Sequence, residues 1–288
     1  MEGGVRWAFN TRRWRPSAGE WAAALALVQA EEKERIGRFM FRRDAKAALA
    51  GRLLLRKLAA DILGIPWGTV ALERTEHGRP CLVAAQAVAV GAVDFNVSHQ
   101  GAYAVLAAAA GMAVGVDVME VRPPPGRSID IFLASMRRQL SLVEWDHVRA
   151  FPDEHRRLAA FYRLWCLKEA VIKARGDGLT FALQRLSLTP AGPTPTPPPG
   201  PLTLDTTLAI DGVHDPAWYF QETMLDPTHP VAVALHCPAL ASAPPPHNAP
   251  RATHFTELTY DQLTSSATPL TPLDLGAGQA FMAKAEAP

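Results

Sequence analysis

The segment YRLWCLKEAVIKARGDG, residues 162 to 178, constrains the fold more than any other stretch of the chain. At 100° per residue, aromatic and sulfur-containing side chains fall on one helix face and aliphatic side chains on the other. A helix that is apolar nearly all round is buried in the protein interior. The face that carries Trp165 and Cys166 also carries a carboxylate, Glu169, and an ammonium group, Lys173, one turn apart. A buried charge needs strong compensation, so this pair indicates a functional site.

Glu169 and Lys173 also have a simpler interpretation. An i,i+4 ion pair on a solvated helix face stabilises the helix by only a few tenths of a kcal/mol and requires no function. We favour a functional role because the neighbouring side chains on this face are apolar. Lys168 and Arg175 lie in a different sector of the helix, where we expect ordinary surface charges.

A second candidate acid lies in the predicted strand GVDVMEV, residues 115 to 121. Alternation places Gly115, Asp117 and Met119 on one face of the strand, and Glu120 on the other, where we expect solvent exposure. Aspartate is disfavoured inside strands, and a neighbouring glycine allows another group to approach closely. The position suits an acid that binds a metal ion or a metal and phosphate together. The alternative is an aspartate that caps a turn at the end of the strand.

Positive charge is concentrated in the first 80 residues. They hold 15 Lys and Arg against 9 Asp and Glu, a local charge of +6, whereas the whole chain carries +1. Around the turn at residues 76–80, Arg74, His77 and Arg79 could converge with backbone amides on an anion. His99, at the end of a strand in FNVSHQG, could donate an N–H to a phosphate. A solvated helix face is the simpler interpretation for the basic side chains that precede them, Arg35, Arg38, Arg42, Arg43 and Lys46.

Several function classes lack their sequence signatures. Neither a P-loop nor a dinucleotide-binding glycine motif occurs, and no G-x-S-x-G supports a hydrolase around Ser98. A nucleic-acid binder that uses the helix at residues 40–60 is an alternative, although the excess charge is small and few aromatics interleave with the basic residues. The uncharged run at 102–116 is too short to cross a bilayer, and no secretory signal is evident. Three widely spaced cysteines favour a reducing compartment, the cytosol.

The patterns along the chain predict an α+β fold built from two units and a tail. We expect an N-terminal subdomain over 1–112, a C-terminal subdomain over 113–240, and a Pro-rich, mostly disordered tail over 241–288, from which 254–263 could dock on the remainder. Capping boxes of the form S-x-x-E begin helices at 17–20 and 141–144. A short helix followed by a long one is predicted within 31–64, and a further long helix, which contains the segment 162–178, is predicted after Pro152. The predicted strands are 5–9, 69–75, 92–99, 102–109, 113–121, 181–188, 203–211, 216–222 and 230–237.

Two of these motifs together resemble the paired signature of the Sfp-type 4′-phosphopantetheinyl transferases. That signature is G-[VI]-D-[VIL] followed by [FW]-x-x-K-E-[AS]-x-x-K, matched here by GVDV at 115–118 and WCLKEAVIK at 165–173. Either motif alone is weak, but the ordered pair at this separation is specific. The segments EEKERIGRFMFRRDAKAALAGRLLLRKL and FNVSHQGAYAVLAA are similar to animal members of the family. The similarity covers roughly residues 3–237 and fades in the proline-rich loop and the tail.

The resemblance implies a fold, a reaction and two small partners. The fold has two similar α/β subdomains in a pseudo-two-fold arrangement, with coenzyme A and Mg²⁺ bound in the cleft between them. The reaction transfers the 4′-phosphopantetheine arm of coenzyme A to a serine of an apo acyl or peptidyl carrier protein. The products are the holo-carrier and adenosine 3′,5′-bisphosphate. Because the nucleophile belongs to the carrier protein, this chain needs no activated Ser or Cys of its own.

The resemblance also implies roles for individual residues. Asp117 and Glu169 would be Mg²⁺ ligands; Met119 stands where many relatives have a third acid and is a poor ligand for this ion, so water would take its place. Glu169 would also be the general base for the carrier serine, directly or through a water, and Lys173 would hold the diphosphate and offset charge on the leaving group. The other positions that match the coenzyme A site are Arg35, Arg74, Thr75, Glu76, His77, Gly78, Arg79, Asn96, Val97, Ser98, His99, Ala170, Val171 and Ile172.

The implied protein partners are apo carrier proteins or carrier domains of the fatty-acid synthase, mitochondrial carrier or aminoadipate reductase type. Carriers are typically acidic around the modified serine, which suits the basic first half of the chain. We expect a cytosolic monomer whose two halves mimic a dimer, with no nucleic-acid or membrane partner. The alternative function is a non-catalytic module that binds coenzyme A or acidic proteins. Such a module would not need Asp117, Glu169 and Lys173 together.

Overall fold

The structure is a computed structural model that describes residues 4–176, 178, 181–190, 192–238 and 252–287, and its elements confirm a mixed α+β fold. The first part of the chain contains β1 (Val5–Asn10), α1 (Ala18–Leu25), α2 (Ala30–Gly37), α3 (Arg42–Lys57), β2 (Leu72–Arg74), β3 (Pro80–Leu82), α4 (Ala84–Val90), β4 (Val93–Gln100) and β5 (Tyr103–Ala110). The second part contains β6 (Ala113–Val118), α5 (Ile129–Ser135), α6 (Leu142–Arg149), α7 (Glu154–Arg175), β7 (Leu186–Thr189), β8 (Thr207–Ile210), β9 (Val213–His214), β10 (Trp218–Asp226) and β11 (His229–His236). The last part contains β12 (Thr256–Glu257), α8 (Tyr260–Thr264) and α9 (Leu275–Met282).

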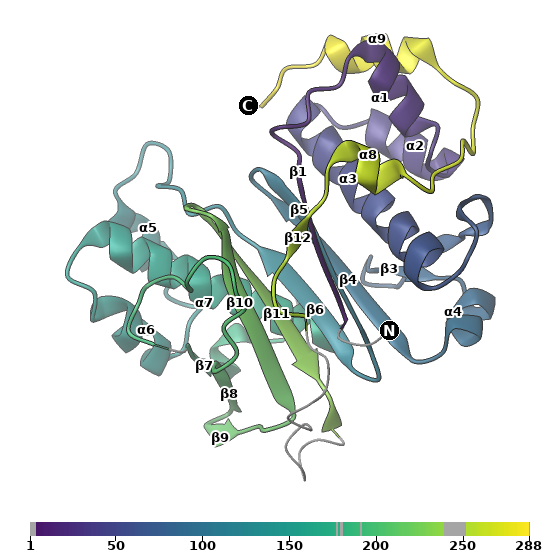
Figure 1. Ribbon diagram of the computed structural model, residues 1–288. Helices are drawn as coiled ribbons and strands as arrows, with labels where there is room; N and C mark the ends of the chain where they lie inside the picture. The colour runs from purple at the N-terminus through teal and green to yellow at the C-terminus, as the bar shows by residue number, and fades with distance from the viewer. Residues whose placement is uncertain (1–3, 177, 179–180, 191, 239–251, 288) are drawn as a thin grey trace.

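Two sheets form the centre of the molecule (Figure 1). One has the strand order β12-β1-β5-β4, and the other has the order β10-β11-β6. A cluster of buried aliphatic side chains lies between them, with Val105 and Ala107 from β5 facing Val114, Val116 and Val118 of β6. The alternation expected for β6 is thereby confirmed, since its valines lie on one face.

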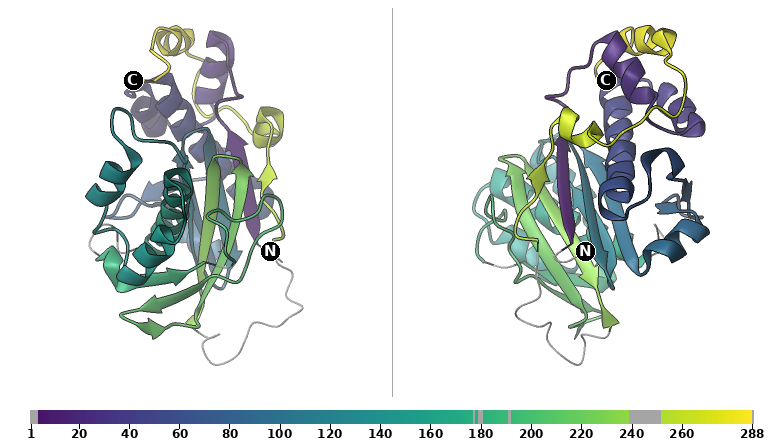
Figure 2. Two further views of the ribbon diagram at one scale, coloured as in Figure 1. Left: turned by 90° about the vertical axis from the view of Figure 1, so that its left-hand side faces the viewer. Right: turned by 45° about the vertical axis from the view of Figure 1, so that its right-hand side comes forward.

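Helices α3 and α7 cover the outer faces of the two sheets (Figure 2). α3 packs on β5 through Leu49 and Leu53, which share a core with Leu106. α7 begins after Asp153, whose side chain accepts from the backbone of Arg156, and it ends at Gly176 in the left-handed conformation, with φ 75°. Both helices therefore hold functional side chains against rigid sheets. The expected buried helix in this segment is confirmed.

Side chains of β4 join the two sheets along one edge. The edge of β6 that does not pair with β11 would leave backbone N–H groups unsatisfied. Asp94 Oδ2 accepts from the Val114 amide at 2.7 Å, and Asn96 Oδ1 accepts from the Val116 amide at 3.1 Å. The alternating polar positions of β4 thus replace a strand-to-strand ladder. Ser98 is the next residue in this row and reaches the candidate site.

The expectation of a mostly disordered tail is wrong for residues 252–287, which fold onto the first part of the chain (Figures 1 and 2). β12 adds a parallel strand beside β1, and α9 packs on α1, where the rings of Phe281 and Trp21 stack with centroids 3.8 Å apart. Composition suggested disorder because Pro, Ala, Ser and Thr dominate. Three buried apolar residues, Leu258, Leu263 and Phe281, anchor the segment on the protein. Residues 239–251 lie outside the described part of the chain.

No helix in the described ranges has both the length and the apolar character that crossing a membrane requires. The predicted turn at 76–80 is confirmed as the loop between β2 and β3, where the Thr75 amide donates to the Arg79 carbonyl at 2.9 Å. Both predicted capping boxes are confirmed, at Ser17 with Glu20 and at Ser141 with Glu144.

Candidate functional site

An ion pair between β6 and α7 forms the centre of the candidate site. Lys173 Nζ lies 2.6 Å from Asp117 Oδ1, and the Ser98 hydroxyl of β4 donates to the same oxygen at 2.7 Å. Lys173 Nζ also donates to Ser98 Oγ at 2.7 Å. In the described part of the chain, Lys173 therefore pairs with Asp117 across two elements and not with Glu169 on its own helix. Three predicted residues meet where β4, β6 and α7 come together.

Gly115 allows α7 to approach β6 closely enough to make this contact. A Cβ atom at Gly115 would lie 1.9 Å from the carbonyl oxygen of Ala170 and 2.5 Å from the amide nitrogen of Ala174. The glycine expected to permit close approach in this strand thus admits a helix backbone. Cys166, on the same side of α7, contributes a thiol that donates to the Asp117 carbonyl at 3.1 Å. The small residues of this interface set the distance between the acid on β6 and the charges on α7.

Gly115→Ala is expected to separate α7 from β6 and to lower both stability and activity. Overpacking of this kind costs about 1–3 kcal/mol of unfolding free energy, and here the clash is with backbone that cannot rotate away. Gly19→Ala is the matched control, because nothing lies within 4 Å of a Cβ atom at that helical position. Urea unfolding of both variants checks the prediction. A Gly115→Ala protein as stable as Gly19→Ala would show that the close approach is unimportant.

Two carboxylates share the partly buried space beside Lys173. The pKa of Glu169 is raised because burial disfavours its charged form and because Asp117 repels it, although Lys173 opposes the rise. The second oxygen of Asp117, Oδ2, is buried and has no hydrogen-bond partner in the described structure. Within that same part of the chain, no three His, Cys, Asp or Glu side chains gather as a metal site. The arrangement therefore combines two neighbouring acids with one buried carboxylate oxygen that lacks a hydrogen-bond partner in the described structure.

A cavity of about 290 Å³ opens next to Lys173 and is lined mainly by basic side chains. Six residues predicted for coenzyme A line it together: Arg35, Arg74, Val97, Ser98, His99 and Lys173. We call this cavity the anion pocket. Arg52 of α3 also lines it and was missed by the sequence prediction. The available signal was an arginine inside the apolar run GRLLLRKL, the same kind of anomaly that drew attention to Glu169.

The turn between β2 and β3 divides its predicted residues between two places. Arg74 lines the anion pocket, whereas Thr75, Glu76, His77 and Arg79 line a separate cavity of about 510 Å³. Arg79 holds the turn against the rest of the site through five acceptor atoms of four residues. It donates to the Lys173 carbonyl at 2.8 Å, to both Asp94 carboxylate oxygens at 2.7 and 2.8 Å, and to the carbonyls of Phe95 and Val114 at 2.7 and 3.0 Å. The Arg79 guanidinium thus fixes the position of Lys173.

For the other predicted coenzyme A residues, the structure shows contacts within the protein. Asn96 is buried and accepts from the β6 backbone. Ala170, Val171 and Ile172 belong to α7, and their side chains lie in the hydrophobic core that this helix covers. Gly78 lies at the tip of the turn with φ 78°, where glycine is favoured. Contact of coenzyme A with these five residues stays a prediction.

Lys168 is not a surface charge, and that expectation is wrong. Its side chain is 1% exposed, its Nζ lies 2.6 Å from the buried Glu144 carboxylate of α6, and it donates to the carbonyls of Leu183 and Leu186 at 2.8 and 3.0 Å. α6 and the strand region around β7 cover the sector of α7 that we expected to face solvent. Arg175, by contrast, is exposed as expected, and its guanidinium lies over the ring of Phe181.

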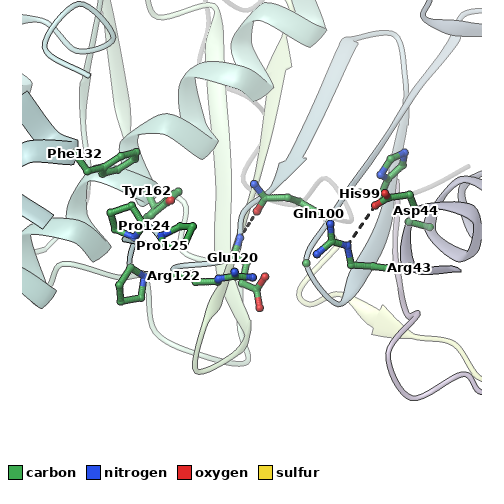
Figure 3. A pocket seen from close by; sticks show the side chains of 13 residues that line it. Arg43, Asp44, His99, Gln100, Glu120, Arg122, Pro124, Pro125, Phe132 and Tyr162 are labelled. Carbon is green, nitrogen blue, oxygen red and sulfur yellow. Dashed lines mark hydrogen bonds and ion pairs between the residues drawn. The ribbon is translucent and has the colours of Figure 1, made fainter. Parts of the chain in front are cut away.

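A third cavity, of about 410 Å³, lies between the two halves of the chain (Figure 3). Arg43 and Asp44 of α3 line one side, and Arg122, Phe132 and Tyr162 line the other. His99 lines both this cavity and the anion pocket, so the two adjoin. We call this third cavity the interhalf pocket.

Glu120, which also lines the interhalf pocket, is less exposed than expected. Its side chain is 20% exposed and pairs with Arg12 at 2.9 Å. Its backbone amide donates to the Gln100 side chain, as the dashed line in Figure 3 shows. Glu120 therefore ties the end of β6 to the first half of the chain at the rim of the pocket.

Comparison with known proteins gives two family matches and several relatives. Residues 12–111 match the family model described as 4′-phosphopantetheinyl transferase, N-terminal, and residues 113–223 match the 4′-phosphopantetheinyl transferase superfamily. The L-aminoadipate-semialdehyde dehydrogenase-phosphopantetheinyl transferase of Homo sapiens is 44% identical over 94% of this chain and 88% of its own length. The protein of that name from Xenopus laevis is 43% identical over 99% of this chain and 94% of its own. The 4′-phosphopantetheinyl transferase of Bacillus subtilis is 32% identical over 60% of this chain and 70% of its own.

Proposed function

The chain belongs to the 4′-phosphopantetheinyl transferase superfamily, and from this premise we propose that Asp117 and Glu169 hold a divalent cation, Mg²⁺, at the reacting diphosphate. As a member of the family, the protein is a transferase that moves the 4′-phosphopantetheine arm of coenzyme A, its co-substrate, to a carrier-protein serine. The other product is adenosine 3′,5′-bisphosphate. The non-catalytic alternative has no support from the relatives.

The metal proposal rests on Asp117 Oδ2, a buried oxygen that has no hydrogen-bond partner in the described structure. A buried carboxylate oxygen without a partner is costly, and a cation bound there would satisfy it. Such a cation would also relieve the crowding of negative charge that raises the pKa of Glu169. Two carboxylates are few ligands, but Mg²⁺ is commonly held by one or two carboxylates, with waters and substrate phosphates completing its shell. When bound, the ion would neutralise charge on the phosphates.

Each side chain at the centre then has a role in the transfer. Glu169 accepts the proton of the carrier serine, and the serine oxygen forms a bond to the phosphorus that carries the pantetheine arm. The bond from that phosphorus to the bridging oxygen breaks, and the electron pair leaves with adenosine 3′,5′-bisphosphate. Lys173, held by Ser98 and by Arg79 through its backbone, places an ammonium charge beside the leaving phosphate.

We place the carrier protein at the interhalf pocket. This pocket adjoins the anion pocket through His99 and presents Arg43 and Arg122 to a partner. Acidic carriers suit such a surface, and the names of two relatives point to carriers of the aminoadipate reductase type. Carriers of fatty-acid synthase and mitochondrial type remain part of the proposal. So does action as a monomer in the cytosol, and the three free cysteines support that compartment.

The pseudo-two-fold arrangement is likewise a proposal. It is supported by the cover of one helix on each sheet, α3 over β4 and β5 and α7 over β6 and β11. The two family matches meet between residues 111 and 113, which supports subdomains over 1–112 and 113–240. Residues 252–287 would then belong to the first subdomain, on which they pack.

Asp117→Asn is expected to raise the Mg²⁺ concentration needed for half-maximal transfer by about 10- to 100-fold. The neutral amide keeps the shape of the side chain but removes one of two anionic ligands. The assay mixes enzyme, coenzyme A, Mg²⁺ and an apo carrier protein, and measures the mass gained by the carrier. Asp146→Asn, the same change at an exposed residue of α6 that lines neither the anion pocket nor the interhalf pocket, is the control. An unchanged Mg²⁺ requirement in Asp117→Asn would remove this residue from the metal site, and no mass gain with the unmodified enzyme on any carrier would overturn the proposed function.

A further inference from the structure

Three arginine side chains that line the anion pocket, from α2, α3 and β2, converge on one carboxylate, whereas Lys173 comes to the same pocket from α7 and pairs with Asp117. Arg35 Nε lies 2.8 Å from Glu32 Oε2, whereas Arg74 Nη2 and Arg52 Nε lie 3.1 and 3.3 Å from Glu32 Oε1. We call Arg35, Arg52 and Arg74 the arginine cluster. Burial by itself raises the pKa of Glu32, but the three guanidinium groups outweigh it and the pKa is lowered. Glu32 is therefore charged at neutral pH, and the arginine cluster retains an excess of two positive charges.

Arg52 is the member of the arginine cluster that the protein leaves incompletely bonded. Its side chain is 7% exposed, and its Nη1 is buried without a hydrogen-bond partner in the described structure. Arg56, one turn later on α3, is equally buried, but its two Nη groups donate to the carbonyls of Trp67 and Val70 at 2.8 and 3.0 Å. A buried guanidinium N–H without an acceptor is costly. Since Arg52 lines the anion pocket, a ligand in that pocket can supply the missing acceptor.

The charge of the arginine cluster indicates which phosphate it binds. Coenzyme A carries a diphosphate, with one negative charge on each phosphorus, and a 3′-phosphate monoester, with nearly two charges at neutral pH. The diphosphate must lie beside Lys173, Asp117 and Glu169, where the proposed transfer takes place. An excess of two positive charges matches a monoester dianion, and guanidinium groups recognise phosphate by paired hydrogen bonds.

We propose that Arg52 binds the 3′-phosphate of coenzyme A and, within the arginine cluster, makes the enzyme distinguish coenzyme A from its 3′-dephospho form. This inference rests on the proposed function only in placing the diphosphate at Lys173. It assigns a specificity-determining role to a residue that the sequence motifs did not include. Arg52 acts on the adenosine side of the substrate, so the product adenosine 3′,5′-bisphosphate retains the group that it binds.

The test compares binding of adenosine 3′,5′-bisphosphate with binding of adenosine 5′-monophosphate, by calorimetry, in Arg52→Met and the matched control Arg56→Met. Because one charged hydrogen-bonding partner is lost, the affinity for the bisphosphate is expected to fall about 10- to 100-fold in Arg52→Met. The monophosphate, which lacks the 3′ group, is expected to bind almost as before. Arg56→Met is expected to keep the wild-type ratio of the two affinities. Arg52→Lys, which retains a charge but not the forked donors, is expected to give an intermediate loss and serves if Arg52→Met does not fold.

The outcomes separate this inference from the proposed function. A folded Arg52→Met protein with the wild-type ratio overturns the inference, and so does an equal loss for both ligands, because Arg52 would then merely support the pocket. The mass assay on an apo carrier is run in parallel on the unmodified enzyme. If the unmodified enzyme transfers the arm but Arg52→Met keeps the wild-type ratio of the two affinities, the function stands and the inference is refuted. If the affinity ratio falls in Arg52→Met but the unmodified enzyme transfers nothing, the inference is supported and the function is refuted.

Discussion

Glu169→Gln is expected to reduce phosphopantetheine transfer about a thousandfold, within the range that positioned general bases contribute. Glutamine preserves the size of the side chain and removes only its charge and its ability to accept a proton. The unmodified Glu169 has a raised pKa because it is partly buried and lies near Asp117. Removing its charge relieves that repulsion, so without Mg²⁺ the variant should unfold at the same temperature as the unmodified protein or slightly higher. Initial transfer rates and thermal unfolding measured on one preparation test both halves of the prediction.

Glu154→Gln is the matched control for this experiment. It makes the same chemical change in the first turn of α7, about 22 Å from Glu169 along the helix at 1.5 Å per residue. Transfer by this variant should equal that of the unmodified enzyme. Lys168, which the sequence suggested as an exposed control, is unsuitable because it is buried. A Glu169→Gln enzyme that kept more than a tenth of its activity would exclude Glu169 as the base.

Periodicity predicted the parts of the site that depend on one element at a time. Alternation along β6 placed Asp117 opposite the valines, and the period of α7 placed Glu169 and Lys173 together on one face. Strand and helix geometry dictate these relations before any packing occurs. The family resemblance placed Asp117 and Lys173 in one site, but it did not predict the ion pair between them. Residue spacing alone does not say which strand lies under which helix.

Contacts between distant segments could not be read from the sequence, which is why Lys168 was wrongly expected at the surface. The amide of Asn96, in the motif NVSH, satisfies the exposed edge of β6, and its contact with coenzyme A stays a prediction. Arg79, predicted to bind an anion, donates to Asp94 and to carbonyls of three elements, and its contact with coenzyme A also stays a prediction. The polar residues of a strand edge or a turn have the same appearance in sequence whether they bind a ligand or complete the fold. Only the position of the acceptors distinguishes the two.

The expectation of a mostly disordered tail was wrong for a different reason. Its composition is typical of disordered segments, and composition is an average over many residues. A few apolar residues can nevertheless dock such a segment when a groove already exists on the folded protein. Phe281 stacks on Trp21, and the carboxylate of Glu286 pairs with Lys46 at the start of α3. The α3 N-terminus has no side-chain cap of its own, and the carbonyls of Ala285 and Glu286 accept from its first amides.

Lys168→Met is expected to lower the free energy of unfolding by about 3–5 kcal/mol, because it leaves the Glu144 carboxylate buried without its counter-ion. Glu144 is 0% exposed, and its two oxygens accept from the amides of Ser141 and Leu188 at 2.7 and 2.9 Å. These bonds hold the carboxylate in place, so it cannot turn toward water. Arg38→Met is the control: it breaks an exposed i,i+4 pair with Glu34, for which a loss of about 0–1 kcal/mol is expected. Urea unfolding of the two variants measures the difference, and similar losses would show that burial of the Lys168 pair has no special cost.

A double-mutant cycle then separates the charge from the packing. If the loss in Lys168→Met comes from an unpaired carboxylate, adding Glu144→Gln should restore part of the stability, with a coupling of about 1–3 kcal/mol between the two positions. Additive losses would instead assign the effect to the carbonyls of Leu183 and Leu186, which also lose their donor when Lys168 is replaced. Lys168 and Glu144 line neither the anion pocket nor the interhalf pocket. The folded fraction of each single variant and of the double variant should therefore transfer at a rate near that of the unmodified enzyme. Lys168 and Glu169 are adjacent in sequence, so this contrast would show that α7 supports the fold on one face and carries the proposed chemistry on the other.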